Sequence, residues 1–407
     1  MKCYDLVVVG GGAAGLFGAA VAAGKGLSVL LLERNSRCGK KIAITGKGRC
    51  NLTNTRKWSE FAEHIHPNPN FFKNAFFGMS NEQTMAFFES IGLSLTIERG
   101  QRVFPSSMRA QEVNDVLLAH LRKLGVTIIT EARVKRTSKE GELFKTETEP
   151  GKNGRSFFSK KLLVATGGLS YPATGSTGDG YEMAKNFGHK IIPCFPSLTA
   201  LLPLDYNKAL SGIVLKNIEI SLYLNGVEVE SEFGEMEFTD DGIEGAAAIK
   251  LSRKAVPALL DGQKVELAID LKPALSPEQL ASRIERERME NGIESLNLLL
   301  KRMLPGQLVA PFMKSCRELN MKNLPLHLKE WRFKVTSYVG YRRSIVTAGG
   351  VELGEISPKS MESKLVRGLY FAGEVLNLDG DTGGYNLQIA FSTAALAAES
   401  VVRELTL

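Results

Sequence analysis

The glycines at the start of the chain are the residues whose type and spacing most directly indicate chemistry. Gly10, Gly12 and Gly15 follow the apolar run 6–9 in the spacing G-x-G-x-x-G. In a dinucleotide-binding turn, the first glycine permits the tight turn, the second lets the backbone approach a pyrophosphate, and the third lets helix and strand pack closely. The N-terminus of the following helix supplies free N–H groups for the phosphates. The contacts expected from this turn are Gly10, Gly12, Ala13, Ala14 and Gly15.

An acidic residue stands where this motif requires one. A helical pattern leads from the glycines to Lys25, a second apolar strand covers 28–32, and Glu33 closes that strand. A carboxylate at this position accepts hydrogen bonds from the ribose hydroxyls of adenosine. Because strand, turn, helix, second strand and acid stand in register, the pattern is much more specific than the glycines alone. It predicts a dinucleotide site formed by the segment from Leu6 to Glu33.

A basic, glycine-rich segment after Glu33 favours FAD over NAD. It covers 34–49, where we expect a long loop that wraps an extended anionic cofactor; a solvated surface loop is the alternative. Two later segments fit the same cofactor. The strand and turn at 125–134 resemble those that contact adenine in this class, and the strand at 162–168 ends in Ala-Thr-Gly-Gly. The contacts expected from these segments are Arg34, Gly39, Lys40, Lys41, Val134, Thr166 and Gly167.

A further glycine-rich segment stands near the C-terminus. The strand 368–372 ends in Gly373 and Glu374, and flavoproteins of this architecture commonly use such an acid, more often aspartate, to bind the ribityl chain. The turn 379–384 precedes an Ala-rich helix, so its N–H groups are expected at the N1–C2=O edge of the isoalloxazine, where negative charge collects on reduction. A turn before a packing helix is the alternative. The expected contacts are Gly373, Glu374, Gly384, Tyr385, Asn386 and Leu387.

Composition narrows the class of protein. The 407 residues are 43% hydrophobic and 23% charged, which is typical of a globular chain of two or three domains. Five scattered cysteines form no CxxC pair and five histidines form no spaced cluster, so we expect no metal and a reduced, cytoplasmic protein. The stretch 6–24 is as long as a membrane span, but the phosphate-binding turn explains its glycines, so no membrane segment is expected. The net charge of +7 suits a cofactor pyrophosphate, an acidic substrate or a polyanion.

The middle of the chain has a different pattern. The run 215–224 alternates apolar and polar residues and leads into Asn225-Gly226, a strong hairpin signal. Ser276-Pro277 begins a helix, with Gln279 at the third helical position. We therefore expect an α/β protein with a Rossmann-like, two-dinucleotide-binding FAD domain of the glutathione reductase type and an inserted β-rich domain carrying a helical subdomain. The expected bounds are 1–193 and 341–407 for the FAD domain, 194–275 and 328–340 for the β-rich domain, and 276–327 for the helical subdomain.

Three longer strings carry a resemblance to a known family. They are 39–54, with Thr-Gly-Lys-Gly-Arg-Cys-Asn-Leu-Thr-Asn, then 165–180, with Ala-Thr-Gly-Gly-Leu-Ser-Tyr-Pro, and 371–388. Over essentially its full length the chain resembles the bacterial NAD(P)/FAD-dependent oxidoreductases of the BaiN/YhiN type, also called HI0933-like flavoproteins. The resemblance implies FAD. Characterised relatives include a reductase of C=C bonds in 3-oxo bile-acid intermediates and an oxidase of aminoacetone.

The resemblance and the cofactor site together suggest three functions. The first is reduction of an enone, such as a 3-oxo-Δ4 or Δ6 steroid, by hydride transfer from flavin N5. This step needs a donor to the ketone oxygen and an acid for the α-carbon, and Tyr171, Tyr341 and Arg342 are the candidates. No second G-x-G-x-x-G is present, so an NAD(P)H donor would visit the flavin face that the substrate uses. The alternatives are an amine or aminoketone oxidase that produces peroxide, and an RNA-binding flavoprotein suggested by the pI near 9.0. A small-molecule substrate is the expected partner, nucleic acid is not favoured, and the sequence leaves the oligomeric state open.

Overall fold

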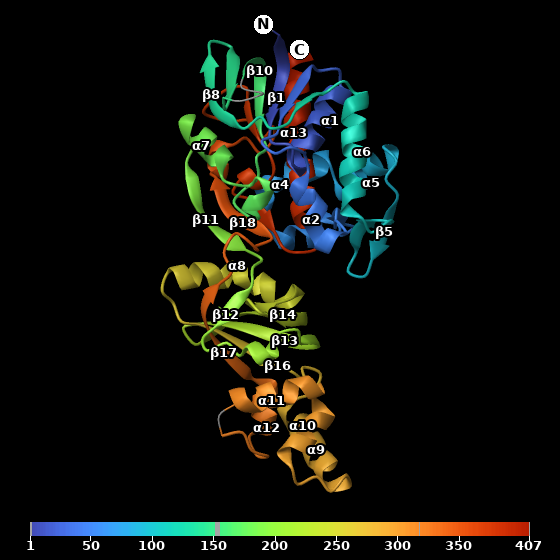
Figure 1. Ribbon diagram of the computed structural model, residues 1–407, viewed down its shortest axis with the longest axis vertical. Coiled ribbons are helices and arrows are strands. Elements are labelled where there is room, and N and C mark those ends of the chain that lie inside the picture. The colour runs from blue at the N-terminus through green and yellow to red at the C-terminus, as the bar shows by residue number, and fades with distance from the viewer. Residues whose placement is uncertain (1, 151–154, 317, 407) are drawn as a thin grey trace. The chain divides into compact units, whose positions relative to one another are not determined.

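The computed structural model describes residues 2–150, 155–316 and 318–406. The chain divides into two compact units (Figure 1). The first contains the residues up to Phe195 and those from Val346 onward, and the second contains Pro196–Ile345. The finer bounds given above for the FAD domain and for the two parts of the insertion stay predictions. Both ends of the chain belong to the first unit, so the second unit is an insertion in the sequence of the first.

A seven-stranded sheet forms the centre of the first unit, with the strand order β7-β2-β1-β10-β9-β8 and with β19 also paired to β10. The strands β7, β2, β1, β10 and β19 run parallel, whereas β9 and β8 form an antiparallel hairpin. Strands β1, β2 and β19 are apolar because they are buried on both faces. The sheet strands are β1 (Cys3–Val9), β2 (Val29–Leu32), β7 (Thr127–Ile129), β8 (Val134–Glu140), β9 (Leu143–Thr148), β10 (Ser156–Val164) and β19 (Leu369–Phe371).

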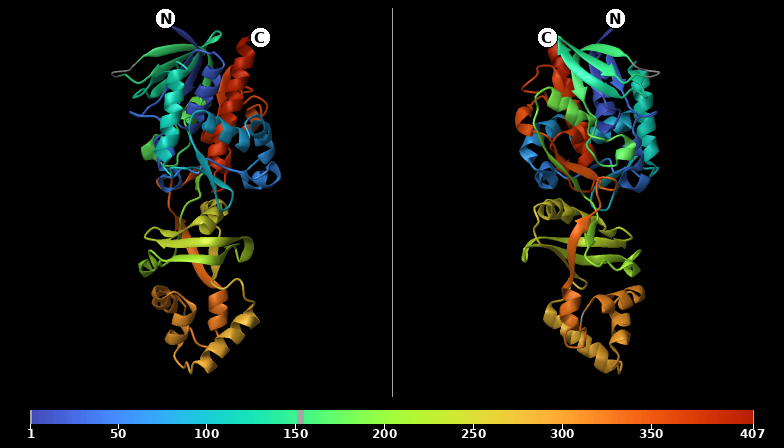
Figure 2. Two further views of the ribbon diagram at one scale, coloured as in Figure 1. Left: turned by 90° about the vertical axis from the view of Figure 1, so that its right-hand side faces the viewer. Right: turned by 60° about the vertical axis from the view of Figure 1, so that its left-hand side comes forward.

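Helix α1 (Ala13–Gly24) packs against α6 (Ala110–Lys123) and against α13 (Tyr385–Thr406) in this unit (Figure 2). The first and last helices lie side by side, with the rings of Phe17 and Phe391 5.0 Å apart. Other helices of the unit are α2 (Lys40–Gly48), α3 (Trp58–Phe61), α4 (Pro69–Gly78), α5 (Asn81–Ser90) and α7 (Asp179–Asn186). The remaining strands are β3 (Thr53–Asn54), β4 (Ile65–His66), β5 (Leu95–Glu98), β6 (Arg102–Pro105), β18 (Val346–Val351), β20 (Asp379–Gly380) and β11 (Ile191–Ser197), whose last two residues belong to the second unit.

The second unit is built on a closed barrel with the strand order β12-β15-β14-β13-β16-β17. Asn225 and Gly226, both with positive φ, join β13 to β14, which confirms the predicted hairpin. Helix α8 (Ala246–Leu260), which was not predicted, packs on β14 and β13. The barrel strands are β12 (Leu201–Pro203), β13 (Val214–Leu224), β14 (Val227–Thr239), β15 (Gly242–Glu244), β16 (Val265–Asp270) and β17 (Trp331–Tyr338).

A group of short helices follows β16 in the same unit. Ser276 caps the first of them, and its capping box with Gln279 is present as predicted. The indole of buried Trp331 at the start of β17 donates to Ser315 Oγ at 2.8 Å and so ties the helices to the barrel. The helices are α9 (Pro277–Glu290), α10 (Leu296–Met303), α11 (Gly306–Ser315) and α12 (Leu324–Lys329). Within the described ranges, every helix is too short or too polar to cross a bilayer.

Candidate cofactor site

The glycine turn between β1 and α1 is tight at one end and open in the middle. A Cβ on Gly15 would lie 1.8 Å from the Gly10 carbonyl oxygen, so helix and strand meet there at a distance that only glycine allows. A Cβ on Gly12 would meet no atom within 4 Å. Gly12 is the N-cap of α1, and Ala13 and Ala14 begin the helix. The turn therefore presents free N–H groups beside open space, which is what a pyrophosphate requires.

Glu33, at the end of β2, is tied to this turn. Its carboxylate is buried and accepts from Gly11 N at 2.8 Å and from Asn35 N at 2.7 Å. The same strand end meets the segment before β8, because Ala132 N donates to the Glu33 carbonyl oxygen at 2.9 Å. Val134, the predicted adenine contact, is the buried first residue of β8. The structure thus brings Glu33 and the predicted adenine strand together beside the glycine turn.

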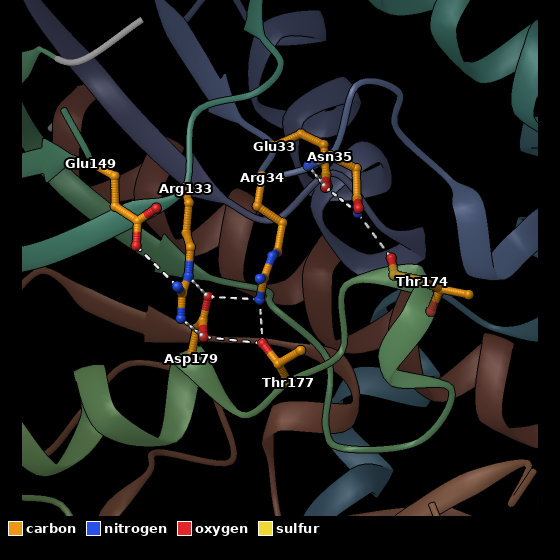
Figure 3. A network of polar contacts seen from close by, with 8 residues as sticks. All are labelled: Glu33, Arg34, Asn35, Arg133, Glu149, Thr174, Thr177 and Asp179. Atoms are coloured by element: carbon orange, nitrogen blue, oxygen red, sulfur yellow. Dashed lines mark hydrogen bonds and ion pairs between the residues drawn. The ribbon is translucent and has the colours of Figure 1, made fainter. Parts of the chain in front are cut away.

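Arg34 has an acidic partner that the sequence did not indicate (Figure 3). Its Nη1 lies 3.1 Å from Asp179 Oδ2 at the start of α7, and Arg133 holds both oxygens of Asp179 at 3.0 Å. Burial raises the pKa of Asp179, but Arg133 and Arg34 outweigh that effect and hold the pKa below its usual range. Arg133 also pairs with exposed Glu149 at 2.9 Å. Arg34 therefore links the start of α7 to the end of β2. A cofactor contact from Arg34 would use the guanidinium N–H groups that do not bind Asp179.

The basic segment that follows is partly helical, where a long loop was predicted. Residues 40–48 form α2, but Thr45, Gly46 and Lys47 have non-helical backbone angles and interrupt it; Ile42 is its buried residue. Lys40 Nζ donates to Asn35 Oδ1 at 3.0 Å. Lys41 Nζ lies 2.7 Å from Glu374 Oε2, and thus joins residues 333 positions apart. Gly39, the N-cap of α2, donates its N–H to the Gly11 carbonyl oxygen at 2.8 Å.

The loop after β10 passes the glycine turn and is held by one buried hydroxyl. A Cβ on Gly10 would lie 2.9 Å from Thr166 Cα, so Thr166 and Gly167 adjoin the turn. Further along, Thr347 Oγ1 accepts from Leu169 N at 2.8 Å and from Ser170 N at 3.0 Å. Thr347 is fully buried on β18. Strand β18 therefore holds the loop that follows the Ala-Thr-Gly-Gly segment.

Replacing Thr347 by Val should destabilise the protein by about 2–4 kcal/mol, because two buried N–H groups lose their acceptor. Thr347→Ser keeps the hydroxyl, loses one methyl group, and should cost only about 1 kcal/mol. Urea unfolding followed by tryptophan fluorescence measures both variants. Equal stability of the Val and Ser variants would show that the hydroxyl does not hold this loop.

The C-terminal segment 373–387 also adjoins the glycine turn and its neighbours. A Cβ on Gly373 would lie 2.8 Å from Ala14 Cβ, and Glu374 accepts from Thr347 N at 2.9 Å in addition to its ion pair with Lys41. Gly384, with φ of +101°, lies so near Thr53 that a Cβ would be 2.4 Å from its carbonyl oxygen. Tyr385, Asn386 and Leu387 begin α13.

The side chains of Tyr385 and Asn386, at the start of α13, make contacts within the protein. The ring of Tyr385 is buried and packs against Phe61 at 4.7 Å. Asn386 Oδ1 accepts from Gly380 N at 2.8 Å, and its Nδ2 donates to Gly380 O at 2.7 Å. These contacts fix the shape of the turn 380–384. Because the Gly380 and Asp381 N–H groups donate within the protein, a cofactor contact from this turn would use the N–H groups that follow them, and that contact stays a prediction.

Two histidines and an aspartate form a cluster that the sequence did not reveal. His64 Nδ1 lies 2.8 Å from Asp381 Oδ2, and His66 Nε2 lies 3.1 Å from Asp381 Oδ1. Burial raises the pKa of Asp381, but hydrogen bonds from His64 and His66 outweigh that effect and hold the pKa well below its usual range. The His64 ring also lies 4.4 Å from the ring of Tyr385. The alternation His-x-His was the available signal, but Asp381 stands 317 positions beyond His64.

The three predicted catalytic residues are not gathered within one unit. Tyr171 lies in the first unit, half-buried and with φ of +54°, after the loop that Thr347 holds. Tyr341 and Arg342 lie in the second unit, where Tyr341 is half-buried and Arg342 is exposed. The neighbouring Arg343 makes the ion pairs there, with Asp241 and with Glu244.

Unsatisfied polar groups near Gly10 and Gly384 leave hydrogen-bonding capacity for a cofactor. Asn51 Oδ1, Thr53 Oγ1 and Thr166 Oγ1 are buried and make no hydrogen bond to the described part of the chain. Cys50, which could approach a flavin, is fully buried, and burial raises the pKa of its thiol to about 12, so it stays protonated. Within residues 2–150, 155–316 and 318–406, no three His, Cys, Asp or Glu side chains are grouped as a metal site would require.

Comparison with known proteins gives relatives that match over nearly the whole chain. The model of the HI0933-like protein Rossmann domain matches residues 4–400. The chain is 31% identical to a ribosomal RNA dihydrouridine synthase of Haemophilus influenzae, with 98% of each chain covered, and 32% identical to one of Escherichia coli, with 99% of each covered. It is 29% identical to a 3-dehydro-bile acid delta(4,6)-reductase of Clostridium scindens, with 97% of this chain and 98% of the relative covered.

Solved structures support the fold. A 3-ketosteroid delta1-dehydrogenase of Sterolibacterium denitrificans superposes with a TM-score of 0.51 at 14% identity, over 99% of this chain and 100% of the other. The Sdh1 complex of Mycobacterium smegmatis gives a TM-score of 0.52 at 16% identity, over 100% of this chain and 69% of the other. At these identities the likeness concerns the fold alone.

Proposed function

This chain belongs to the HI0933-like family, a family of FAD-dependent oxidoreductases with a Rossmann-type fold, and from that premise we propose that it reduces an activated C=C bond in the uracil ring of RNA. The observation that carries the choice of substrate is the full-length similarity, above 30% identity, to two ribosomal RNA dihydrouridine synthases. The net charge of +7 suits an RNA substrate. The sequence alone did not favour a nucleic-acid partner. The similarity to these two relatives is why we now place RNA ahead of a steroid-like substrate.

The chemistry is that of the enone reduction expected from the sequence. The C5=C6 bond of uracil is conjugated to the C4 carbonyl group, so C6 accepts hydride and C5 accepts a proton, as do the β- and α-carbons of an enone. When bound and reduced, the flavin would supply the hydride, and NAD(P)H is the proposed electron donor that would reduce it again. What the chain must add is the binding of the cofactor, the exclusion of water and an acid for C5.

We assign cofactor binding to the residues that the fold gathers around the glycine turn. N–H groups at Gly12 and the start of α1 would hold the pyrophosphate, and the acceptor capacity left on Glu33 Oε2 would hold the adenosine ribose. Glu374 and the turn ending at Gly384 would lie along the ribityl chain and the flavin ring. The Lys41–Glu374 ion pair then closes the site between its N-terminal and C-terminal parts.

We assign the acid to the cluster of His64, His66 and Asp381. Asp381 engages His64 through Nδ1, which leaves Nε2 to carry a transferable proton when the ring is protonated. The side chains of His64 and His66 are 22% and 29% exposed, so a substrate can reach them. The cluster adjoins the turn that we assign to the flavin edge. Tyr171 is the second candidate for this role.

A 3-oxo-Δ4,6 bile-acid intermediate is the second candidate substrate. The observation that favours it is the 29% identity to the Clostridium scindens reductase over the whole chain. The reacting group is again a C=C bond conjugated to a carbonyl, so the same cofactor and acid would serve. The two substrates differ in charge and size, and a direct assay separates them.

The experiment is to incubate the FAD-loaded enzyme and NAD(P)H with a ribosomal RNA fragment and to measure the mass of the nuclease fragments. A gain of two hydrogens at a uridine is the expected result. A fragment in which cytidine replaces every uridine is the matched control and should not change. If the RNA keeps its mass while a 3-oxo-Δ4 bile acid is reduced, the second substrate is correct. Prompt peroxide release in air when aminoacetone replaces NAD(P)H, without either reduction, would instead indicate the amine oxidase.

A further inference from the structure

A cavity of about 830 Å³ lies on the first unit, beside strand β8 and separate from the residues assigned to the cofactor. Strand β8, the C-terminal end of α7 and the segment before β19 line it. Its lining residues include several cationic side chains and no carboxylate. The cations are Lys135, Arg136, Lys139 and Arg367.

One lysine of the lining is held by contacts within the protein. Lys139 Nζ donates to the Arg367 carbonyl oxygen at 2.9 Å and lies 5.6 Å from the centre of the Phe144 ring. It therefore links β8 to the segment before β19, with no carboxylate neutralising it in these contacts. Lys135, Arg136 and Arg367 are exposed, so their charges face solvent. Cations concentrated around a hollow attract an anion more strongly than scattered ones.

The lining residues also include an aromatic side chain. Phe187 at the end of α7 adds a half-buried aromatic ring. Side chains of this kind, an aromatic ring among cations, bind the bases and phosphates of single-stranded nucleic acid.

We propose that this cavity, lined by Lys135, Lys139 and Arg367, binds the phosphate backbone of an RNA segment that flanks the reacting uridine. Lys135 and Lys139 are separated by about 13 Å along an extended strand, which suits a chain of phosphates better than a single phosphate group. The proposal rests on the proposed RNA substrate and gives that RNA a second binding surface away from the flavin. Its cations contribute affinity and position, and the reaction itself occurs elsewhere.

The test is fluorescence anisotropy of the holoenzyme with a labelled single-stranded RNA at several salt concentrations. The variant Lys135→Gln/Lys139→Gln/Arg367→Gln should bind at least tenfold more weakly. Its slope of log affinity against log salt should fall by about 2, at about 0.7 for each phosphate that is no longer neutralised. The matched control is Lys25→Gln/Lys73→Gln/Lys123→Gln, three exposed lysines outside the cavity, which should keep the wild-type slope. Lys139→Arg should restore most of the affinity that Lys139→Gln removes.

The outcomes separate this proposal from the proposed function. An unchanged affinity and slope in the cavity variant, while wild type reduces uridine in RNA, would overturn the cavity and leave the function standing. An equal loss of affinity in the control variant would likewise overturn it, because charge anywhere on the surface would then suffice. Wild type that neither binds nor reduces RNA would overturn both. Displacement of RNA by uridine monophosphate at equal concentration would show a mononucleotide site and overturn the backbone assignment.

Discussion

The variant Gly12→Ala is expected to fold normally and to lose FAD. Gly12 has an ordinary φ of −88°, and its added Cβ would meet no protein atom within 4 Å, so the fold has no reason to suffer. The open space is the space that we assign to the pyrophosphate, and the new methyl group would occupy it. Overpacking of this kind costs about 2 kcal/mol, which weakens FAD binding about 30-fold or more. Flavin retained through gel filtration and a titration of the apoprotein with FAD measure the effect.

Gly24→Ala is the matched control for this prediction. Gly24 ends the same helix α1, and a Cβ there would likewise meet nothing within 4 Å. It should bind FAD as wild type does and be slightly more stable, because alanine restricts the unfolded chain. Full FAD affinity in Gly12→Ala would remove the pyrophosphate from this turn. If Gly12→Ala does not fold, Gly12→Ser, which can cap the helix, replaces it in the same titration.

The variant Asp381→Asn should retain FAD and lose about 100-fold or more in turnover, the range in which a positioned acid contributes. Only one of the two terminal atoms of the asparagine side chain accepts hydrogen bonds. His64 and His66 therefore no longer each bind an oxygen of the same carboxylate. The turn itself is held by Asn386 through Gly380, which keeps the cofactor part of the site intact. The measurements are flavin content, turnover and the pH profile of turnover.

The same aspartate predicts a change in stability with pH. Its pKa is lower in the folded protein than in the unfolded chain, so it stabilises the fold fully above the unfolded pKa of about 3.9. That contribution is lost as the pH falls through the folded pKa. The stability difference between wild type and Asp381→Asn should therefore shrink as the pH falls below the unfolded pKa of about 3.9 into strong acid. A difference that grows over that acid range would contradict the assigned direction of the shift.

His64→Gln and His66→Gln identify which ring transfers the proton. We expect the larger loss of turnover from His64→Gln, because this ring lies on Tyr385 at the start of α13. His120→Gln is the control, since His120 on α6 packs against Phe87 and stands outside the cluster. If neither histidine matters and Tyr171→Phe abolishes turnover, the acid is Tyr171.

Local patterns in the sequence predicted the parts of the fold that depend on a few neighbouring residues. The unit from β1 to Glu33, the Asn225-Gly226 hairpin and the capping box at Ser276 were of this kind. Each follows from turn chemistry, capping or hydrophobic period within a short stretch of the chain. The family resemblance added the cofactor, which the charge and spacing alone could only favour.

Long-range contacts could not be read in the same way. The segment 40–48 follows Gly39 and contains Gly46 and Gly48, so its pattern predicts a loop, whereas residues 40–44 are helical before the non-helical kink at Thr45–Lys47. Asp179 lies 145 positions beyond Arg34, and Asp381 lies 317 positions beyond His64. Such pairs depend on the topology of the sheet, because the sheet brings the ends of β2 and β10 close to the C-terminal segment that contains Gly373 and Asp381.

The proposed reduction of a conjugated C=C bond is tested by reducing the FAD-loaded enzyme without oxygen and following the flavin absorbance after mixing with three acceptors. These are a uridine-containing ribosomal RNA fragment, a 3-oxo-Δ4 bile acid and air. We expect a conjugated C=C bond to reoxidise the flavin much faster than air does, with the RNA fragment the faster of the two substrates. Rapid reoxidation by air with peroxide release, and no response to either conjugated substrate, would contradict the proposed reduction.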